Sequence, residues 1–159
     1  MALPIVEQLL VAIAAALAGI TVSNGYVVSI ASVQRYRAQG QTKLDYPLLL
    51  LKELEDEVLR EVASGPDNLV QRELRLLIGI LASQDFAADA READTLANLL
   101  KADVRRCMAT NAQWGGLAFD TKEIGSGELD PGEGEPDIQS TLFYAIQYEH
   151  RRADPTLGR

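Results

Sequence analysis

Carboxylates are concentrated in one glycine-rich stretch, 125–137, and hard cations such as Ca²⁺ bind oxygen ligands of this kind. The acidic residues of the stretch are Glu128, Asp130, Glu133, Glu135 and Asp137. Their spacing does not match the standard calcium-binding loop. No helix pattern follows the glycines, so a phosphate-binding loop is not indicated either. This composition cannot bury a core, and it predicts a mobile acidic loop.

A second acidic run contains the paired carboxylates that general acid–base catalysis uses. Its members are Glu53, Glu55, Asp56 and Glu57. Runs of charge are more commonly a solvated face than a catalytic site. We therefore expect these side chains to face water.

The chain has one cysteine, Cys107, and one histidine, His150, which are far apart in sequence. This excludes an internal disulfide and the common zinc patterns. Cys107 falls on the apolar face of a predicted helix, where a small core residue is its expected role, and His150 is expected at the surface. A Cys–His nucleophilic pair would require the fold to bring the two together. No catalytic set emerges, so we expect no enzyme, no cofactor and no bound metal.

Length and composition fit a single domain over residues 1–159, because 47% of the 159 residues are hydrophobic. The formal charge of −8 argues against a surface built to grip nucleic acid. The apolar run Leu9–Ile20 is shorter than the roughly 20 residues of a membrane span. No basic residue precedes it, as a signal peptide would need. It predicts a helix buried on most sides, partly against another subunit.

Hydrophobic periodicity predicts the elements that position these residues. Steps of three and four predict helices at 3–18 and from Phe86 to the turn at Trp114-Gly115-Gly116, where Trp114 is expected to anchor the packing. Alternation predicts strands, which are 26–37, 46–54, 69–83, 117–124 and 138–149. A helix competes for 48–62, since Leu and Glu both favour helix.

The strands do not alternate regularly with the helices, which favours an α+β fold. We expect a mixed, mainly antiparallel sheet of about four to five strands, covered by two main helices. Mobile loops are predicted near 38–45 and 125–137.

The order of these segments resembles the tail terminator proteins of long-tailed bacteriophages, also called minor tail or tail completion proteins. The resemblance is carried by the helix that ends in 20–26 (ITVSNGY), the strand leading to 33–35 (VQR), the segment 46–50 (YPLLL), the helix containing 97–105 (ANLLKADVR), the turn 114–118 (WGGLA) and the strand ending at 148–151 (YEHR). It covers nearly the full length. The stretch 57–68 matches least, and nothing is transferred there.

This resemblance implies a structural protein of the virion, located at the head-proximal end of the tail and assembled in the host cytoplasm. Family members form a hexameric ring that caps the tail tube and stops its polymerisation at the length set by the tape-measure protein. The ring then provides a docking surface for head-completion or connector proteins. The implied partners are further copies of the chain, the major tail tube protein, the connector and the tape-measure protein. DNA passes through the lumen without specific binding, and no membrane is involved.

Charged residues near the two loops are the candidate contacts. Our hypothesis is that Glu128, Asp130, Glu133 and Glu135 bind a neighbouring subunit or the tube, against Arg35, Arg37 and Lys43. The alternative is a solvated loop without a partner.

Two other functions stay open. A head-completion or neck protein, which joins head to tail, would share the ring logic and bind the portal side. A small α+β enzyme or ligand-binding domain would need a concave pocket with convergent polar groups.

Overall fold

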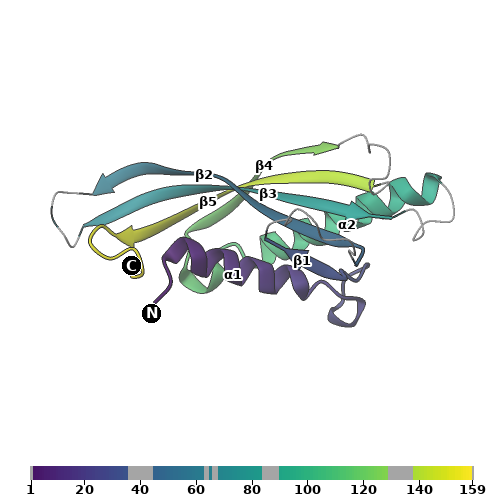
Figure 1. Ribbon diagram of the computed structural model, residues 1–159, viewed down its shortest axis with the longest axis horizontal. Coiled ribbons are helices and arrows are strands. Elements are labelled where there is room, and N and C mark those ends of the chain that lie inside the picture. The colour runs from purple at the N-terminus through teal and green to yellow at the C-terminus, as the bar shows by residue number, and fades with distance from the viewer. Residues whose placement is uncertain are drawn as a thin grey trace.

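The computed structural model describes residues 2–35, 45–62, 65, 68–83, 90–128 and 138–158. Its main elements, in chain order, are α1 (Ile5–Ala18), η1 (Val22–Asn24), β1 (Ser32–Gln34), β2 (Leu48–Val62), β3 (Leu69–Ala82), α2 (Ala90–Thr110), η3 (Trp114–Gly116), β4 (Asp120–Glu128) and β5 (Ile138–Arg151) (Figure 1). The predictions for residues 36–44 and 129–137 lie outside the described residues.

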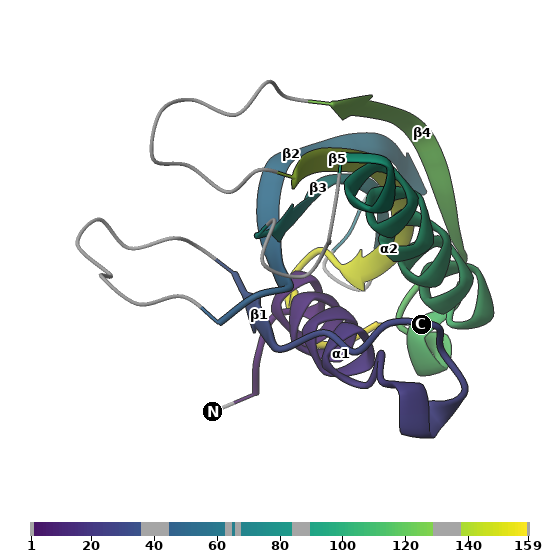
Figure 2. The ribbon, with the colours of Figure 1, turned by 90° about the vertical axis from the view of Figure 1, so that its right-hand side faces the viewer.

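The strands form one five-stranded sheet in the order β1-β2-β3-β5-β4. All neighbours are antiparallel except β1 and β2, which run parallel. Figure 2 shows the sheet curving around the two helices, which lie on its concave side. The predicted α+β fold, with a mainly antiparallel sheet covered by two helices, is confirmed.

The central strand β3 buries one face completely. Leu74, Leu76, Ile78 and Ile80 have no solvent exposure, as the alternation predicted. Their neighbours on β5 include Tyr144 and Leu142, which are buried as well, so the two strands share one apolar face. This face is the floor of the core.

Both helices cover this floor. The predicted face of α1 is buried at Ile5, Leu9 and Ile13. From α2, Leu100, Val104, Cys107 and Met108 enter the same core, so Cys107 is the core residue that its position predicted. Within the described part of the chain, neither helix is long and apolar enough to cross a membrane.

The predicted strand at 26–37 is wrong over most of its length, because only Ser32–Gln34 pairs as β1. The backbone before it bonds elsewhere. The N–H groups of Val27 and Val28 donate to Asp103 of α2, at 2.9 and 2.8 Å. The N–H of Ile30 donates to the carbonyl of Ile20 at 2.9 Å. With its donors used in this way, the segment cannot join the sheet.

The second predicted strand, 46–54, is too short, and the competing helix over 48–62 is wrong. β2 pairs with β3 from Leu48 to Val62, and the two strands form a long hairpin arm. Register shifts accommodate Leu54 and Leu59 as extra residues on β2, so each marks a β-bulge. Cross-strand pairing has overridden the helix preference of this glutamate-rich run.

The fourth strand begins three residues later than predicted, at Asp120, and continues to Glu128. Gly115 and Gly116 have φ of 68° and 92°, and the N–H of Ala118 bonds back to Gln113, so 117–118 belong to the turn. Residues 125–128, predicted as loop, therefore lie in a strand. Trp114 anchors the turn as predicted: it is 6% exposed, and its Nε1 donates to Thr121 at 2.9 Å.

The buried carboxylate of Asp103 should be essential for stability. Asp103→Ala would leave two backbone donors without their acceptor, and we expect the free energy of unfolding to fall by about 2–4 kcal/mol in urea denaturation. The matched control is Asp94→Ala, at an exposed position of the same helix, with an expected change within about 0.5 kcal/mol. Equal effects of the two variants would contradict the anchoring role.

Candidate functional site

Arg35 lies just after β1 and is held by α1. Its guanidinium makes two hydrogen bonds to the carboxylate of Glu7, the second at 2.9 Å. This hydrogen bonding raises the pKa of Arg35 and lowers that of Glu7. The pair ties the short edge strand to the first helix at a half-exposed position, with side-chain exposures of 40% and 34%.

Glu128, at the end of β4, is also bonded within the chain. It accepts a hydrogen bond from Lys101 of α2 at 2.8 Å, which lowers the pKa of Glu128. The lysine side chain is only 12% exposed, whereas the glutamate is 74% exposed. One turn further along α2, Arg105 binds Glu123 of β4 through both carboxylate oxygens.

Of the predicted interface residues, the structure thus describes Arg35 and Glu128, and it does not join them to each other within one chain. Each has its own partner on the nearest helix. The remaining predicted contacts lie outside the described residues, and they are Arg37, Lys43, Asp130, Glu133 and Glu135.

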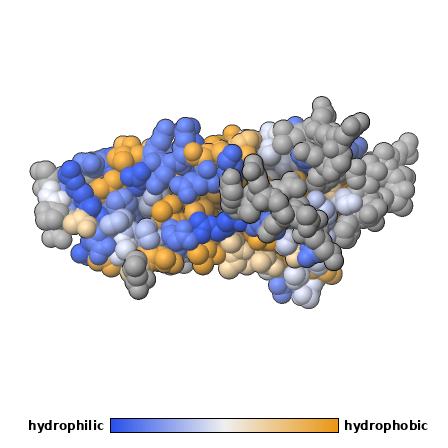
Figure 3. All heavy atoms as spheres, in the orientation of Figure 1, coloured by the Kyte–Doolittle hydropathy of each residue, from blue (hydrophilic) through white to orange (hydrophobic). Residues whose placement is uncertain are grey.

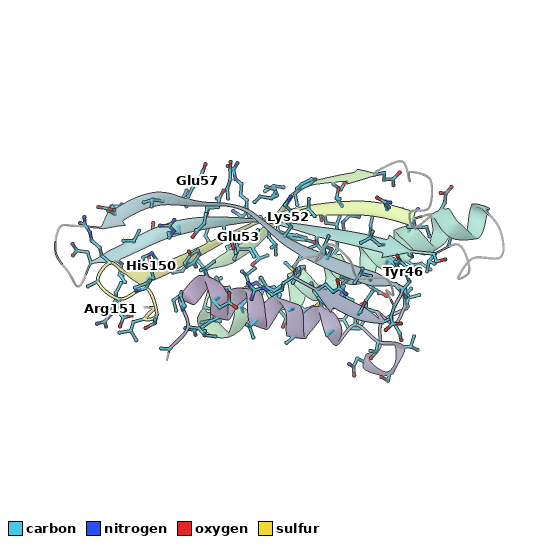
Figure 4. All side chains as sticks on the ribbon, in the orientation of Figure 1. Tyr46, Lys52, Glu53, Glu57, His150 and Arg151 are labelled. Atoms are coloured by element: carbon cyan, nitrogen blue, oxygen red, sulfur yellow. The ribbon has the colours of Figure 1, made fainter. Side chains whose placement is uncertain are left out.

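The acidic run on β2 is the solvated face that was expected, with one exception. Glu55 and Glu57 are exposed and share Arg75 of β3, at 3.1 and 3.9 Å, and Glu73 also contacts this arginine at 3.4 Å. Figure 4 shows Lys52, Glu53 and Glu57 spaced along β2. This surface therefore carries more acidic than basic groups.

Asp56 is the exception, because it is part of a polar network on the other face of the strand. It accepts hydrogen bonds from Arg72 Nε at 3.0 Å and from the hydroxyl of Tyr148 at 2.9 Å. Burial and the nearby carboxylate raise the pKa of Tyr148 above its ordinary value. Alternation places Asp56 on the opposite face from Glu55 and Glu57. The bulge at Leu54 shifts the phase of the strand, so Glu53 shares the face of Asp56.

Large apolar side chains remain exposed at several places. They are Leu3, Val11, Val22, Val27, Leu54, Val58, Leu59, Ile124 and Leu157, with exposed fractions of 43% to 60%. Figure 3 shows hydrophobic surface gathered over α1. The outward side of α1 also carries exposed alanines, Ala15 and Ala18. A helix that is apolar on nearly all sides needs a partner to cover it.

The sheet has open edges on both sides. Among the described residues, β1 pairs with β2 only at Leu48–Leu50, and none of them pairs with the outer backbone edge of β2 from Leu51 to its end. β4 forms the opposite edge, and it contains a bulge at Ile124. Long open edges are templates for pairing with another chain. Hydrophobic periodicity could not predict these open edges, because it shows which face of a strand is buried and not which strands lie at the edge of a sheet.

A hollow of about 430 Å³ lies between the start of α1, the turn at 115–119 and the tail segment 156–158. Its Gln8 already bonds Leu3 and Thr156, and Glu149 receives a hydrogen bond from Gln71 at 2.6 Å. Arg151 also lines this hollow, and the second carboxylate oxygen of Glu149 is buried without a hydrogen-bond partner among the described residues.

The sequence candidates for nucleophilic chemistry have other roles. Cys107 is 1% exposed, and burial raises the pKa of its thiol, which disfavours the reactive thiolate. His150 is half-buried on β5, opposite Val70, and stacks loosely on Tyr148 at 6.3 Å. Among the described residues, no group of three or more His, Cys, Asp or Glu is placed to hold a metal ion.

No protein-family model matches the chain, and no curated protein matches it either. A functional proposal therefore depends on the segment pattern of the sequence and on the surfaces described above.

The Glu7–Arg35 pair predicts a pH dependence. Because the folded-state pKa of Glu7 is lowered from 4.5, its stabilisation is present above that value and is lost as pH falls through the lowered pKa. Exposure limits the effect to about 0.5 kcal/mol. Glu7→Gln should therefore lower the free energy of unfolding at pH 6.5 but not at pH 3, as measured by urea denaturation.

The control for this measurement is Glu61→Gln, at an exposed glutamate whose arginine lies 3.6 Å away. A difference between the wild type and Glu7→Gln that is the same at both pH values would show that the ion pair does not act through the charge of Glu7.

Proposed function

We propose that this chain is a tail terminator protein of a long-tailed bacteriophage. It forms a hexameric ring on the head-proximal end of the tail tube, stops tube polymerisation and provides the docking surface for the head-completion or connector protein. The role is structural and includes no catalytic step.

The first support is the segment pattern. The described segments of the resemblance fall at distinct structural points of the fold: 20–26 follows α1, 97–105 supplies part of the buried face of α2, and 114–118 is the turn into β4. The order and spacing of these segments are what the resemblance rests on.

The observation that carries the proposal is the amount of exposed apolar surface and open strand edge on this small protein, both of which a partner could cover. The outward face of α1 is apolar, with Leu3 and Val11 each 48% exposed. Exposed apolar residues also lie on the two outer strands of the sheet, with Leu54, Val58 and Leu59 on β2 and Ile124 on β4. A ring repeats one heterologous contact until it closes, and it would cover such surfaces in every subunit at once.

The charge distribution also suits the proposal. The helix-free side of the arm carries the glutamates that share Arg75, and the formal charge of the chain is −8. A lumen lined in this way repels phosphates, so DNA can slide past without being held. The proposed partners are the tube protein, the connector and the tape-measure protein, in the virion tail.

The ring and its activity can be measured together. A closed hexamer of the 17.3 kDa chain should give a mass of roughly 100 kDa by light scattering, with rings in particle images. Added to growing tail tubes of its phage, the protein should bind one end and stop elongation. A head-completion or neck protein would form rings without stopping the tube, so this assay separates the two functions. Failure to bind any tube end would contradict the proposal.

The acidic contacts are a separate expectation. Neutralising Glu128, Asp130, Glu133 and Glu135 to the corresponding amides should weaken ring formation or tube capping, because these groups are proposed to bind a neighbour or the tube. The matched control neutralises Glu55 and Glu73, which contact Arg75 within the chain. Unchanged assembly and capping in the first variant would show that the acids are merely solvated.

A further inference from the structure

We infer that the open edge of β2 pairs with β4 of a second copy of this chain, so that the sheet continues from one subunit to the next. This inference rests on the proposed ring and names the contact that closes it. β2 and β4 lie at opposite sides of one sheet, apart from the short β1. Successive antiparallel pairs through β3 and β5 make β4 run opposite to β2. In copies related by rotation, β2 of one subunit would therefore run antiparallel to β4 of the next.

The bulges select one register. Leu54 and Leu59 are extra residues on β2, and Ile124 is the extra residue on β4. When Lys122 is placed opposite Glu57 of the neighbour, the bulges at Ile124 and Leu54 fall opposite each other. The bulge at Leu59 then lets Asp120 lie opposite Arg60. In this register, residues of β4 that point to the helix-free face lie opposite residues of β2 that point to the same face.

The side chains brought together have complementary charge. Lys122 and Glu57 both lie on the helix-free face, which follows from the pairings through Ala145 and Arg75. Within one chain their contacts are weak: Lys122 meets half-buried Asp120 at 3.2 Å, and Glu57 lies 3.9 Å from Arg75. Arg60 is exposed and makes no ion pair with the described residues. Pairing between copies gives Lys122 and Arg60 each an opposite charge across the strands.

The one like-charged pair in this register is already neutralised. Glu123 would lie opposite Asp56, but Glu123 is bound by Arg105, and Asp56 is bound by Arg72 and Tyr148. At the other end, Lys52 of the neighbour would lie opposite Gly127 and meets no like charge. The exposed apolar residues at the bulges, Leu54 and Ile124, would cover each other.

A symmetric contact of β2 with β2 is disfavoured by the same reasoning. It would bring two edges rich in glutamate together, with Glu53, Glu55 and Glu57 of one copy facing those of the other. Like charges directly opposite each other destabilise a strand pair. The heterologous contact is therefore the one that the charges favour, and it is also the kind that closes a ring.

Disulfide trapping tests the register. Ser126 and Glu53 would be direct cross-strand neighbours, and both are exposed. The double variant Ser126→Cys/Glu53→Cys should give a ladder of covalent oligomers on non-reducing gels, ending at the ring. Each single variant should not. The native Cys107 is buried and should stay silent. The matched control, Ser126→Cys/Glu61→Cys, moves one cysteine about 25 Å along the arm and should not form the ladder.

Charge reversal tests the pairing independently. Lys122→Glu and Glu57→Lys should each lower the association constant about tenfold, measured by light scattering over a concentration series. The double variant should recover most of the loss, which general destabilisation would not do. Glu61→Lys, outside the register, serves as the exposed control.

The possible failures are distinguishable. Rings that cap tubes but give no ladder and no charge rescue would overturn this contact and leave the proposed function standing. A ladder from the offset control as strong as that from the test pair would overturn the register. Trapping to the tube protein instead of to itself would assign the edge to that partner. If neither oligomers nor a ladder form at any concentration, the contact is overturned. Tube capping would then decide the function separately.

Discussion

The burial of one face of β3 is the constraint on which the rest of the fold depends. Four successive inward residues, Leu74 to Ile80, are fully buried, and each contributes about 1.5–3 kcal/mol relative to an exposed position. To keep that face dry, both helices must lie on the same side of the sheet. β2 and β5 are then fixed by pairing along nearly the whole length of β3. The opposite face and both outer edges are left to water or to other molecules.

The parts of the fold that sequence could predict are those governed by local periodicity. The alternation of β3 and the apolar stripe of α2 each depend on one segment and one core, and both were read correctly. The segment before β1 failed because its backbone donors go to Asp103, which is 75 residues or more away in sequence. The local sequence pattern of 26–37 cannot predict hydrogen bonds to a carboxylate so distant in sequence.

Two other differences between prediction and structure also have physical causes. The run Glu53–Glu61 has the composition of a helix, but its pairing with β3 decides its structure. That pairing is set by the apolar residues Leu48–Leu51, which precede the run in β2. The beginning of β4 depends on glycines with positive φ after Trp114. For the candidate site, sequence could locate exposed charge but not its partners, because Arg35 and Glu128 each find theirs on a helix distant in sequence.

The anchoring of Val27 and Val28 on Asp103 has a mechanical consequence. The chain leading into β1 is attached to α2 by two hydrogen bonds to one buried carboxylate, and Arg106 of the same helix adds a bond to the carbonyl of Gly25 at 2.7 Å. A force applied to β1 is therefore transmitted to α2, a helix of 21 residues, and is not absorbed by a flexible linker. Because α2 is packed on the central strands, the load is shared by the whole core. The weakest edge of the sheet is in this way stiffened by one of the longest elements of the domain.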